Sequence, residues 1–129
     1  MHVDASAMVA IILGESDRES LVHRLDHADK RTTSAVAVLE TVMAIGRETG
    51  DRSAGLPAVR NFLEVADIGT VPIGADLIED LADAYLRYGK GSDSPARLNL
   101  GDCFSYAVAK KTGAPLLYKG NDFALTDLG

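Results

Sequence analysis

Four acidic residues stand beside apolar segments that lie far apart along the chain. Asp4 follows the apolar start, Glu40 is the single charge in an apolar stretch, Asp102 enters a third apolar segment, and Asp122 follows a fourth. Carboxylates that are brought together repel one another and raise each other's pKa unless a cation compensates. If folding gathers these residues, they form a site for a cation that prefers hard oxygen ligands, Mg²⁺ or Mn²⁺.

Such a site favours phosphodiester hydrolysis, because one or two bound ions can activate water and stabilise the leaving oxygen. No set of His or Cys side chains competes as a zinc site. His23 and His27 have the i, i+4 spacing of some zinc helices, but no Glu follows His23 and no third ligand is evident. The pattern indicates a nuclease and leaves open whether one metal ion binds or two.

The elements that must position these acids alternate between strands and helices. This alternation predicts an α/β fold with a parallel sheet, right-handed crossovers and helices on both faces. Short strands are expected over residues 1–4, 31–34, 68–73 and 115–118. Helices are expected over residues 5–13, 16–28, 35–45, 56–66, 75–88 and 100–112.

The sheet edge supplies the reason for the acids to meet. Ligands of open α/β sheets gather outside the carboxyl ends of the strands. Asp4 ends the first strand, Asp122 follows the last, and Glu40 and Asp102 occupy helices that begin near the same edge. Purely structural roles also exist for two of them. Asp102 can complete a cap with Asn99, and Glu40 can pair with an arginine such as Arg31 or with a backbone donor.

Size and charge narrow the possible functions. A chain of 129 residues is expected to form one domain, over residues 1–129, and its net charge is −6. The charge is uneven, because residues 87–119 are net positive. We therefore expect a basic surface near Asp102 that contacts an anionic substrate through Arg97, Lys110, Lys111 and Lys119.

Cysteine usage and hydropathy bear on the compartment. Cys103 is the only cysteine, so no intrachain disulfide can form and a reducing, cytoplasmic environment is expected. No stretch has the length and apolar character of a membrane span, so no membrane association is expected.

Four segments resemble one family when they are taken together and in order. They are residues 3–7 (VDASA), Glu40 within its apolar helix, residues 98–107 (LNLGDCFSYA) and residues 117–123 (LYKGNDF). The chain resembles the PIN-domain ribonucleases and, within them, the VapC toxins of bacterial toxin-antitoxin pairs. The resemblance implies a three-layer α/β/α fold with a central, mainly parallel sheet of four to five strands.

The resemblance also implies an Mg²⁺-dependent endoribonuclease, with Mn²⁺ as a substitute. Asp4 and Asp102 would be the principal metal ligands, Glu40 would complete the acidic cluster, and Ser6 would support it. Asp122 is the expected fourth acid, although many similar chains carry an acid where this one has Asn121. Family members are usually homodimers that a VapB-type antitoxin holds inactive.

Two other functions remain open. A non-catalytic binding module could keep this fold and use the pocket for a partner peptide. A receiver-like phosphoacceptor domain also combines a doubly wound sheet with clustered acids and Mg²⁺. The receiver fits less well, because Ala5 and Ser6 follow Asp4 where adjacent acids are needed, and no acid follows the middle strand.

Overall fold

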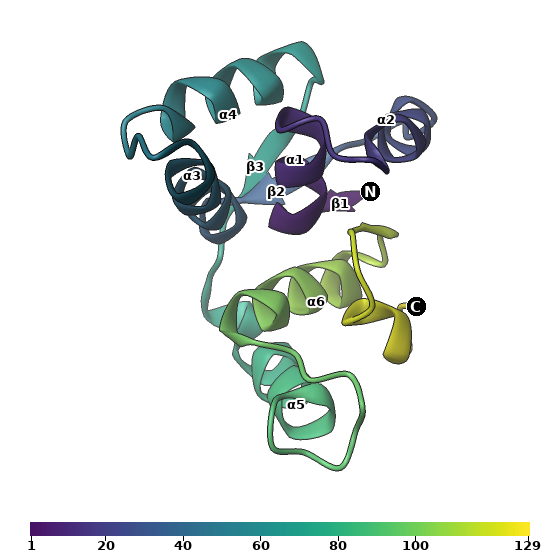
Figure 1. Ribbon diagram of the computed structural model, residues 1–129. Helices are drawn as coiled ribbons and strands as arrows, with labels where there is room; N and C mark the ends of the chain where they lie inside the picture. The colour runs from purple at the N-terminus through teal and green to yellow at the C-terminus, as the bar shows by residue number, and fades with distance from the viewer.

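A four-stranded parallel sheet forms the middle layer of the computed structural model, which describes residues 1–129 (Figure 1). The strand order is β3-β2-β1-β4, and every neighbouring pair is parallel. This confirms the three-layer α/β/α prediction with a central parallel sheet. The strands are β1 (His2–Val3), β2 (Thr32–Ser34), β3 (Gly69–Val71) and β4 (Leu116–Leu117).

Helices cover both faces of this sheet (Figure 1). They are α1 (Ala5–Ile12), α2 (Arg18–Asp26), α3 (Ala35–Thr49), α4 (Gly55–Val65), α5 (Ile78–Tyr88) and α6 (Leu100–Thr112). Two short 3₁₀ helices complete the chain, η1 (Ala75–Leu77) and η2 (Phe123–Leu125). None of the helices has the length and apolar character needed to cross a membrane.

The hydrophobic core is divided between the two faces of the sheet. On one face, Val3 and Leu117 pack with buried side chains of α1 and α2. On the other, Leu116 packs with buried side chains of α5 and α6, including Tyr106. Adjacent strand residues point to opposite faces, so Leu116 and Leu117 serve different halves of the core.

The observed elements differ from the sequence prediction mainly at their ends. Helix α3 continues to Thr49 rather than stopping near residue 45, because Gly50 is the first residue that adopts a left-handed conformation (φ +71°) and can cap it. The helix expected over 75–88 begins as the 3₁₀ turn η1 before α5. The strands are shorter than the apolar runs that predicted them.

Capping residues place three helix starts at one edge of the sheet. Asp4 caps α1 by accepting from the Ser6 amide, and Ser34 caps α3 by accepting from the Ala37 amide. Asn99 and Asp102 form a reciprocal capping box at the start of α6. Asp4 directly follows β1 and Ser34 ends β2, so α1 and α3 begin at the carboxyl edge of the sheet, where ligands of such sheets bind. The start of α6 lies at the same edge, because Asn99 and Asp102 line one hollow with Asp4.

Candidate functional site

The four acidic residues line one hollow at the carboxyl edge of the sheet. Asp4 enters it from the end of β1, Glu40 from α3, Asp102 from the first turn of α6, and Asp122 from the residue that precedes η2. The hollow has a volume of about 450 Å³ and is open to solvent on one side. Folding therefore brings together carboxylates from four separate segments. Asn121, the alternative to Asp122, does not line it.

Asp4 is the most deeply placed of these acids, with 3% of its surface exposed. Its Oδ1 accepts a hydrogen bond from Ser105 Oγ at 2.5 Å. Its Oδ2 accepts from Ser6 Oγ at 2.6 Å and from the Ser6 amide at 3.0 Å. Three donors thus hold the carboxylate in one orientation, and because each oxygen has two lone pairs, Oδ1 keeps one for a further ligand.

Asp102 is fixed by the backbone at the start of α6. The Asn99 amide donates to its Oδ2 at 3.0 Å, and the Asp102 amide donates to Asn99 Oδ1 at 2.8 Å. Burial, together with the charges of Asp4 and Asp122, raises the pKa of the Asp102 carboxyl to about 6, against the lowering effect of the Asn99 amide. The capping role that the sequence allowed is real, and the side chain still lines the hollow.

Glu40 shows the same electrostatic crowding. Burial contributes most, followed by the negative charges of Asp4 and Asp102, and together they raise the pKa of the Glu40 carboxyl to about 7. Neither an arginine nor a backbone donor bonds to this carboxylate, so the paired arrangement with Arg31 is not found. Arg31 instead donates to backbone carbonyls, among them that of Ala66.

The donor set suits a hard divalent cation. All four side chains offer carboxylate oxygens, and a cation among them would relieve the repulsion that raises the pKa of Glu40 and Asp102. No three acidic side chains approach closely enough to enclose one ion by themselves. That spacing is compatible with Mg²⁺, which is bound through one or two carboxylates and keeps several waters.

Comparison with known proteins gives the family. The sequence matches the PIN domain over residues 1–128. The chain belongs to the PIN-domain family. It is 41% identical to Ribonuclease VapC42 of Mycobacterium tuberculosis over 128 residues, which cover 99% of this chain and 96% of that relative. It is 42% identical to Ribonuclease VapC of Mycolicibacterium smegmatis over 128 residues, which cover 99% of this chain and 97% of that relative. It therefore groups with the VapC ribonucleases.

A solved structure supports the fold independently. The crystal structure of Mycobacterium tuberculosis VapC20, described as a sarcin-ricin loop cleaving toxin, superposes with a TM-score of 0.72. The alignment covers 95% of this chain and 92% of VapC20, at 22% sequence identity. At that identity the likeness establishes the PIN fold alone.

Ser6 and Lys119 both line the acidic hollow and contact each other. The Lys119 amide donates to Ser6 Oγ at 3.0 Å, while the same hydroxyl donates to Asp4. The Lys119 ammonium pairs with Glu15 and lies 3.5 Å from Asp17 Oδ1. Lys119 is therefore the one predicted substrate contact that lines the hollow, and its charge is already shared between two carboxylates.

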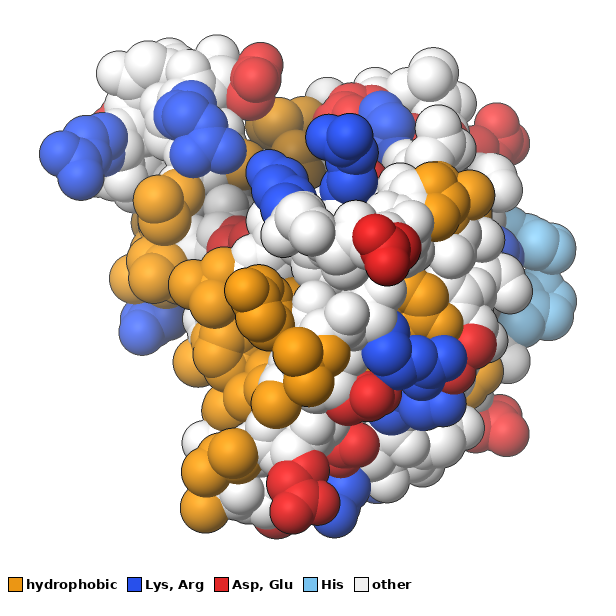
Figure 2. Space-filling model, turned by 90° about the horizontal axis from the view of Figure 1, so that it is seen from below, with side chains coloured by type: hydrophobic (Ala, Val, Ile, Leu, Met, Phe, Trp, Pro, Cys, Tyr) orange, Lys and Arg blue, Asp and Glu red, His pale blue; other side chains and the backbone are white.

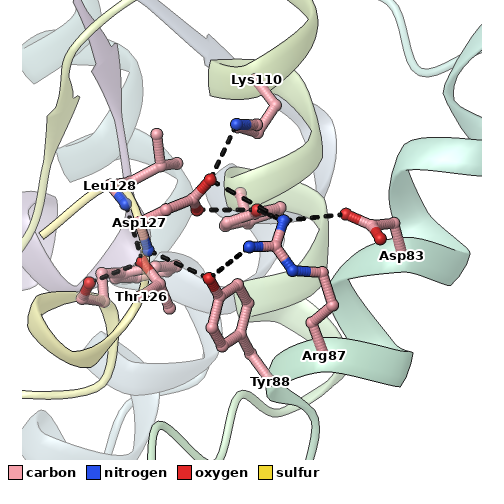
Figure 3. A network of polar contacts seen from close by, with 9 residues as sticks. Asp83, Arg87, Tyr88, Lys110, Thr126, Asp127 and Leu128 are labelled. Carbon is pink, nitrogen blue, oxygen red and sulfur yellow. Dashed lines mark hydrogen bonds and ion pairs between the residues drawn. The ribbon is translucent and has the colours of Figure 1, made fainter.

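The other predicted substrate contacts lie outside the hollow. Lys110 and Lys111 are in the last turn of α6, roughly 12 Å along the helix from Asp102. Lys110 Nζ donates to Asp127 Oδ2 at 2.8 Å within a polar network that joins α5, α6 and the C-terminal segment (Figure 3). Lys111 and Arg97 are exposed and do not line the hollow.

Two residues of the site were missed in the sequence. Ser105 bonds to Asp4, and Arg47 lines the hollow near the end of α3. Their spacing from the acids could have revealed them. Ser105 follows Asp102 by about one helical turn, and Arg47 follows Glu40 by about two, so each lies on the same helix face as the acid before it.

Proposed function

We propose that this protein is a divalent-metal-dependent endoribonuclease, the toxin of a VapC-type toxin-antitoxin pair. The observation that carries the proposal is the gathering of Asp4, Glu40, Asp102 and Asp122 in one hollow, with the pKa of two of them raised toward neutrality. The relatives at 41% and 42% identity are named ribonucleases, which supports RNA as the substrate.

Asp4 and Asp102 are the principal candidates to hold Mg²⁺ or Mn²⁺, and Glu40 and Asp122 complete the acidic set. When bound, such an ion supplies a water of lowered pKa and stabilises negative charge on the phosphate. The fixed orientation of Asp4 is the contribution of Ser6 and Ser105, since a ligand held by three donors needs little reordering when a cation or substrate arrives.

Glu40 is suited to a different role within the same hollow. Its carboxylate lines the hollow, and no side-chain or backbone donor bonds to it, so its oxygens are free to take a proton. Its Oε atoms can therefore accept the proton that an attacking water loses. Lys119 is the candidate for contact with a substrate phosphate, and in that role its ammonium would exchange the carboxylates of Glu15 and Asp17 for phosphate oxygens. Arg97, Lys110 and Lys111 could meet only parts of an RNA that extend beyond the hollow.

A protein partner also belongs to this proposal. The face formed by α5, turned toward the viewer in Figure 2, exposes a broad group of hydrophobic side chains. Its large members on α5 and at the start of α6 are Ile78, Tyr85, Leu86 and Leu100, each more than 60% exposed. Exposed apolar surface of this kind marks protein contacts. The partners that we propose for such contacts are a second copy of the chain and a VapB-type antitoxin. We place these complexes in the cytoplasm.

Cleavage of RNA by the free chain tests the function. Purified protein without antitoxin is incubated with structured and unstructured RNAs in Mg²⁺, in Mn²⁺ and in EDTA, and the new RNA ends are sequenced. We expect cleavage that EDTA stops and that Asp102→Asn abolishes without unfolding the protein. Asp93→Asn is the matched control, because Asp93 is an exposed acid in the loop before α6.

The alternatives give different results in the same experiment. Inertness toward every RNA, with or without metal, together with tight binding of a partner peptide would favour a binding module. Incorporation of label from a small phosphodonor at an Asp would favour the receiver-like domain. Full activity of Asp102→Asn would remove this residue from the site.

A further inference from the structure

A second hollow adjoins the acidic one along α3. It has a volume of about 380 Å³, and Arg47 lines both hollows. Its remaining lining comes from the outer face of α3 and from the loop that follows, namely Leu39, Val42, Met43, Gly46 and Arg52. The two hollows thus meet at Arg47, and the cation of this residue stands at the junction.

Local backbone structure explains why two arginines meet there. After the left-handed cap at Gly50, the chain turns back toward α3. Gly46 permits a close approach, because a Cβ at this position would lie only 3.3 Å from the Cα of Arg52. Asp51 holds the turn by accepting from the Ser53 amide at 3.0 Å and from Ser53 Oγ at 2.6 Å.

Both guanidinium groups are available to a ligand. Arg47 and Arg52 are exposed, and neither makes a hydrogen bond or ion pair with another side chain. The acid of the loop after α3, Asp51, accepts hydrogen bonds from Ser53, and the lining of the second hollow contains no acid. Planar arginine groups match phosphate oxygens with paired donors, so this hollow favours an anion.

The walls of the hollow favour a ligand that is also partly apolar. Leu39 is 58% exposed and Met43 is 53% exposed, one helical turn apart on α3. A nucleotide combines the two requirements, since its phosphate suits the arginines and its base suits an apolar wall with an adaptable methionine. A protein segment would satisfy the apolar wall but would need acidic groups of its own to satisfy the arginines.

We propose that the second hollow binds the nucleotide next to the scissile phosphate of a single-stranded RNA. Arg47, at the junction, contacts the phosphate between the two hollows, Arg52 contacts the next one, and the base packs against Leu39 and Met43. This inference rests on the proposed ribonuclease function and adds to it a subsite that selects for an extended strand on one side of the cleavage point.

Binding of RNA oligonucleotides to the Asp102→Asn protein in Mg²⁺ tests the subsite without cleavage. Arg47→Gln and Arg52→Gln are expected to weaken binding several-fold each. Each should also reduce the slope of log Kd against log salt by about 0.7, the value for one lost phosphate contact on a single strand. Arg60→Gln is the matched control, because Arg60 is exposed on α4 and lines neither hollow.

Cleavage by otherwise unaltered protein gives a second readout. Arg52→Gln should lower kcat/KM for an oligonucleotide that extends on both sides of the cleavage point. It should have no effect on one trimmed at the end that the second hollow would hold. An equal loss on both oligonucleotides, or none on either, overturns the subsite.

The two proposals fail in different ways. If the unaltered protein cleaves RNA while both arginine variants bind and cleave normally, the subsite is wrong and the ribonuclease stands. If the protein cleaves no RNA but binds it through Arg47 and Arg52, the second hollow binds RNA as proposed, but the ribonuclease is wrong and the hollow is not next to a cleavage point. If the arginine variants lose only the binding of a protein partner, the hollow is a protein interface and the subsite is wrong.

Discussion

The carboxylate of Glu40 lies directly against the α-carbon of Gly101. A Cβ added at position 101 would overlap the Glu40 side-chain oxygens. Gly101 is inside the first turn of α6, next to Asp102, where alanine would stabilise a helix by roughly 0.5–1 kcal/mol relative to glycine. The absence of a side chain therefore costs helix stability and leaves room for the Glu40 carboxylate beside Asp102.

Gly101→Ala should separate stability from activity. The helical gain predicts an unchanged or slightly higher free energy of unfolding, because the overlapping atoms are the mobile end of a side chain and can move away. Displacement of Glu40 predicts a loss of about tenfold or more in Mg²⁺ affinity and in cleavage, the usual effect of disturbing groups that position metal ligands. Urea unfolding and metal titration measure the two quantities.

A second mutant background isolates the contact between these two residues. In Glu40→Ala protein, Gly101→Ala should cause no further loss of Mg²⁺ affinity, because the group it displaces is gone. An equal loss in both backgrounds would show that Gly101 acts on the helix itself and not on Glu40.

The raised pKa of Glu40 makes the metal-free protein sensitive to pH. Its pKa in the folded state is about 7 against 4.5 in the unfolded state, so the folded protein holds more protons between these values. Stability from this group is fully present below pH 4.5 and is lost as pH rises through 7. Asp102, with a pKa of about 6, shifts stability in the same direction at lower pH.

Glu40→Gln should remove this dependence. At pH 8 in EDTA we expect the variant to be more stable than the parent by about 1 kcal/mol, a figure reduced from the full shift because water screens a half-buried group. At pH 4 the two proteins should be nearly equal. Urea unfolding at both pH values checks this, and added Mg²⁺ should stabilise the parent more than the variant. A parent that gains stability from pH 5 to pH 8 relative to Glu40→Gln would contradict the assignment.

Ser105→Ala tests the bond that orients Asp4. The substitution leaves the buried Oδ1 without its hydroxyl donor, so the free energy of unfolding should fall by about 2 kcal/mol and Mg²⁺ affinity should fall with it. Ser16→Ala, at an exposed position, should change stability by less than about 0.5 kcal/mol. Equal behaviour of the two variants in urea would mean that the Ser105 hydroxyl does not hold Asp4.

The sequence predicted what local rules control. The alternation of strands and helices followed from periodicity, and the sheet edge predicted that Asp4 and Asp102 would approach each other. Arg47 and Ser105 were not found, because their importance depends on which segment packs against their helix face. The predicted strands were one to three residues longer than the observed ones, because hydrogen bonding between strands, and not apolar character, decides where a strand ends.

Lys110 has two candidate roles, in RNA contact and in the fold, and one experiment separates them. Its positive charge and its place near Asp102 in the sequence predicted contact with RNA. In the fold, Lys110 Nζ donates to Asp127, which also accepts a hydrogen bond from Tyr106 Oη at 2.8 Å (Figure 3). We expect Lys110→Gln to lower the urea midpoint and to speed proteolysis of the C-terminal segment, with RNA affinity changed no more than by Lys111→Gln. Lys111 is the matched control, because it is the next residue, is exposed and forms no ion pair. A normal urea midpoint together with weakened RNA binding in Lys110→Gln would support the substrate role and contradict the structural one.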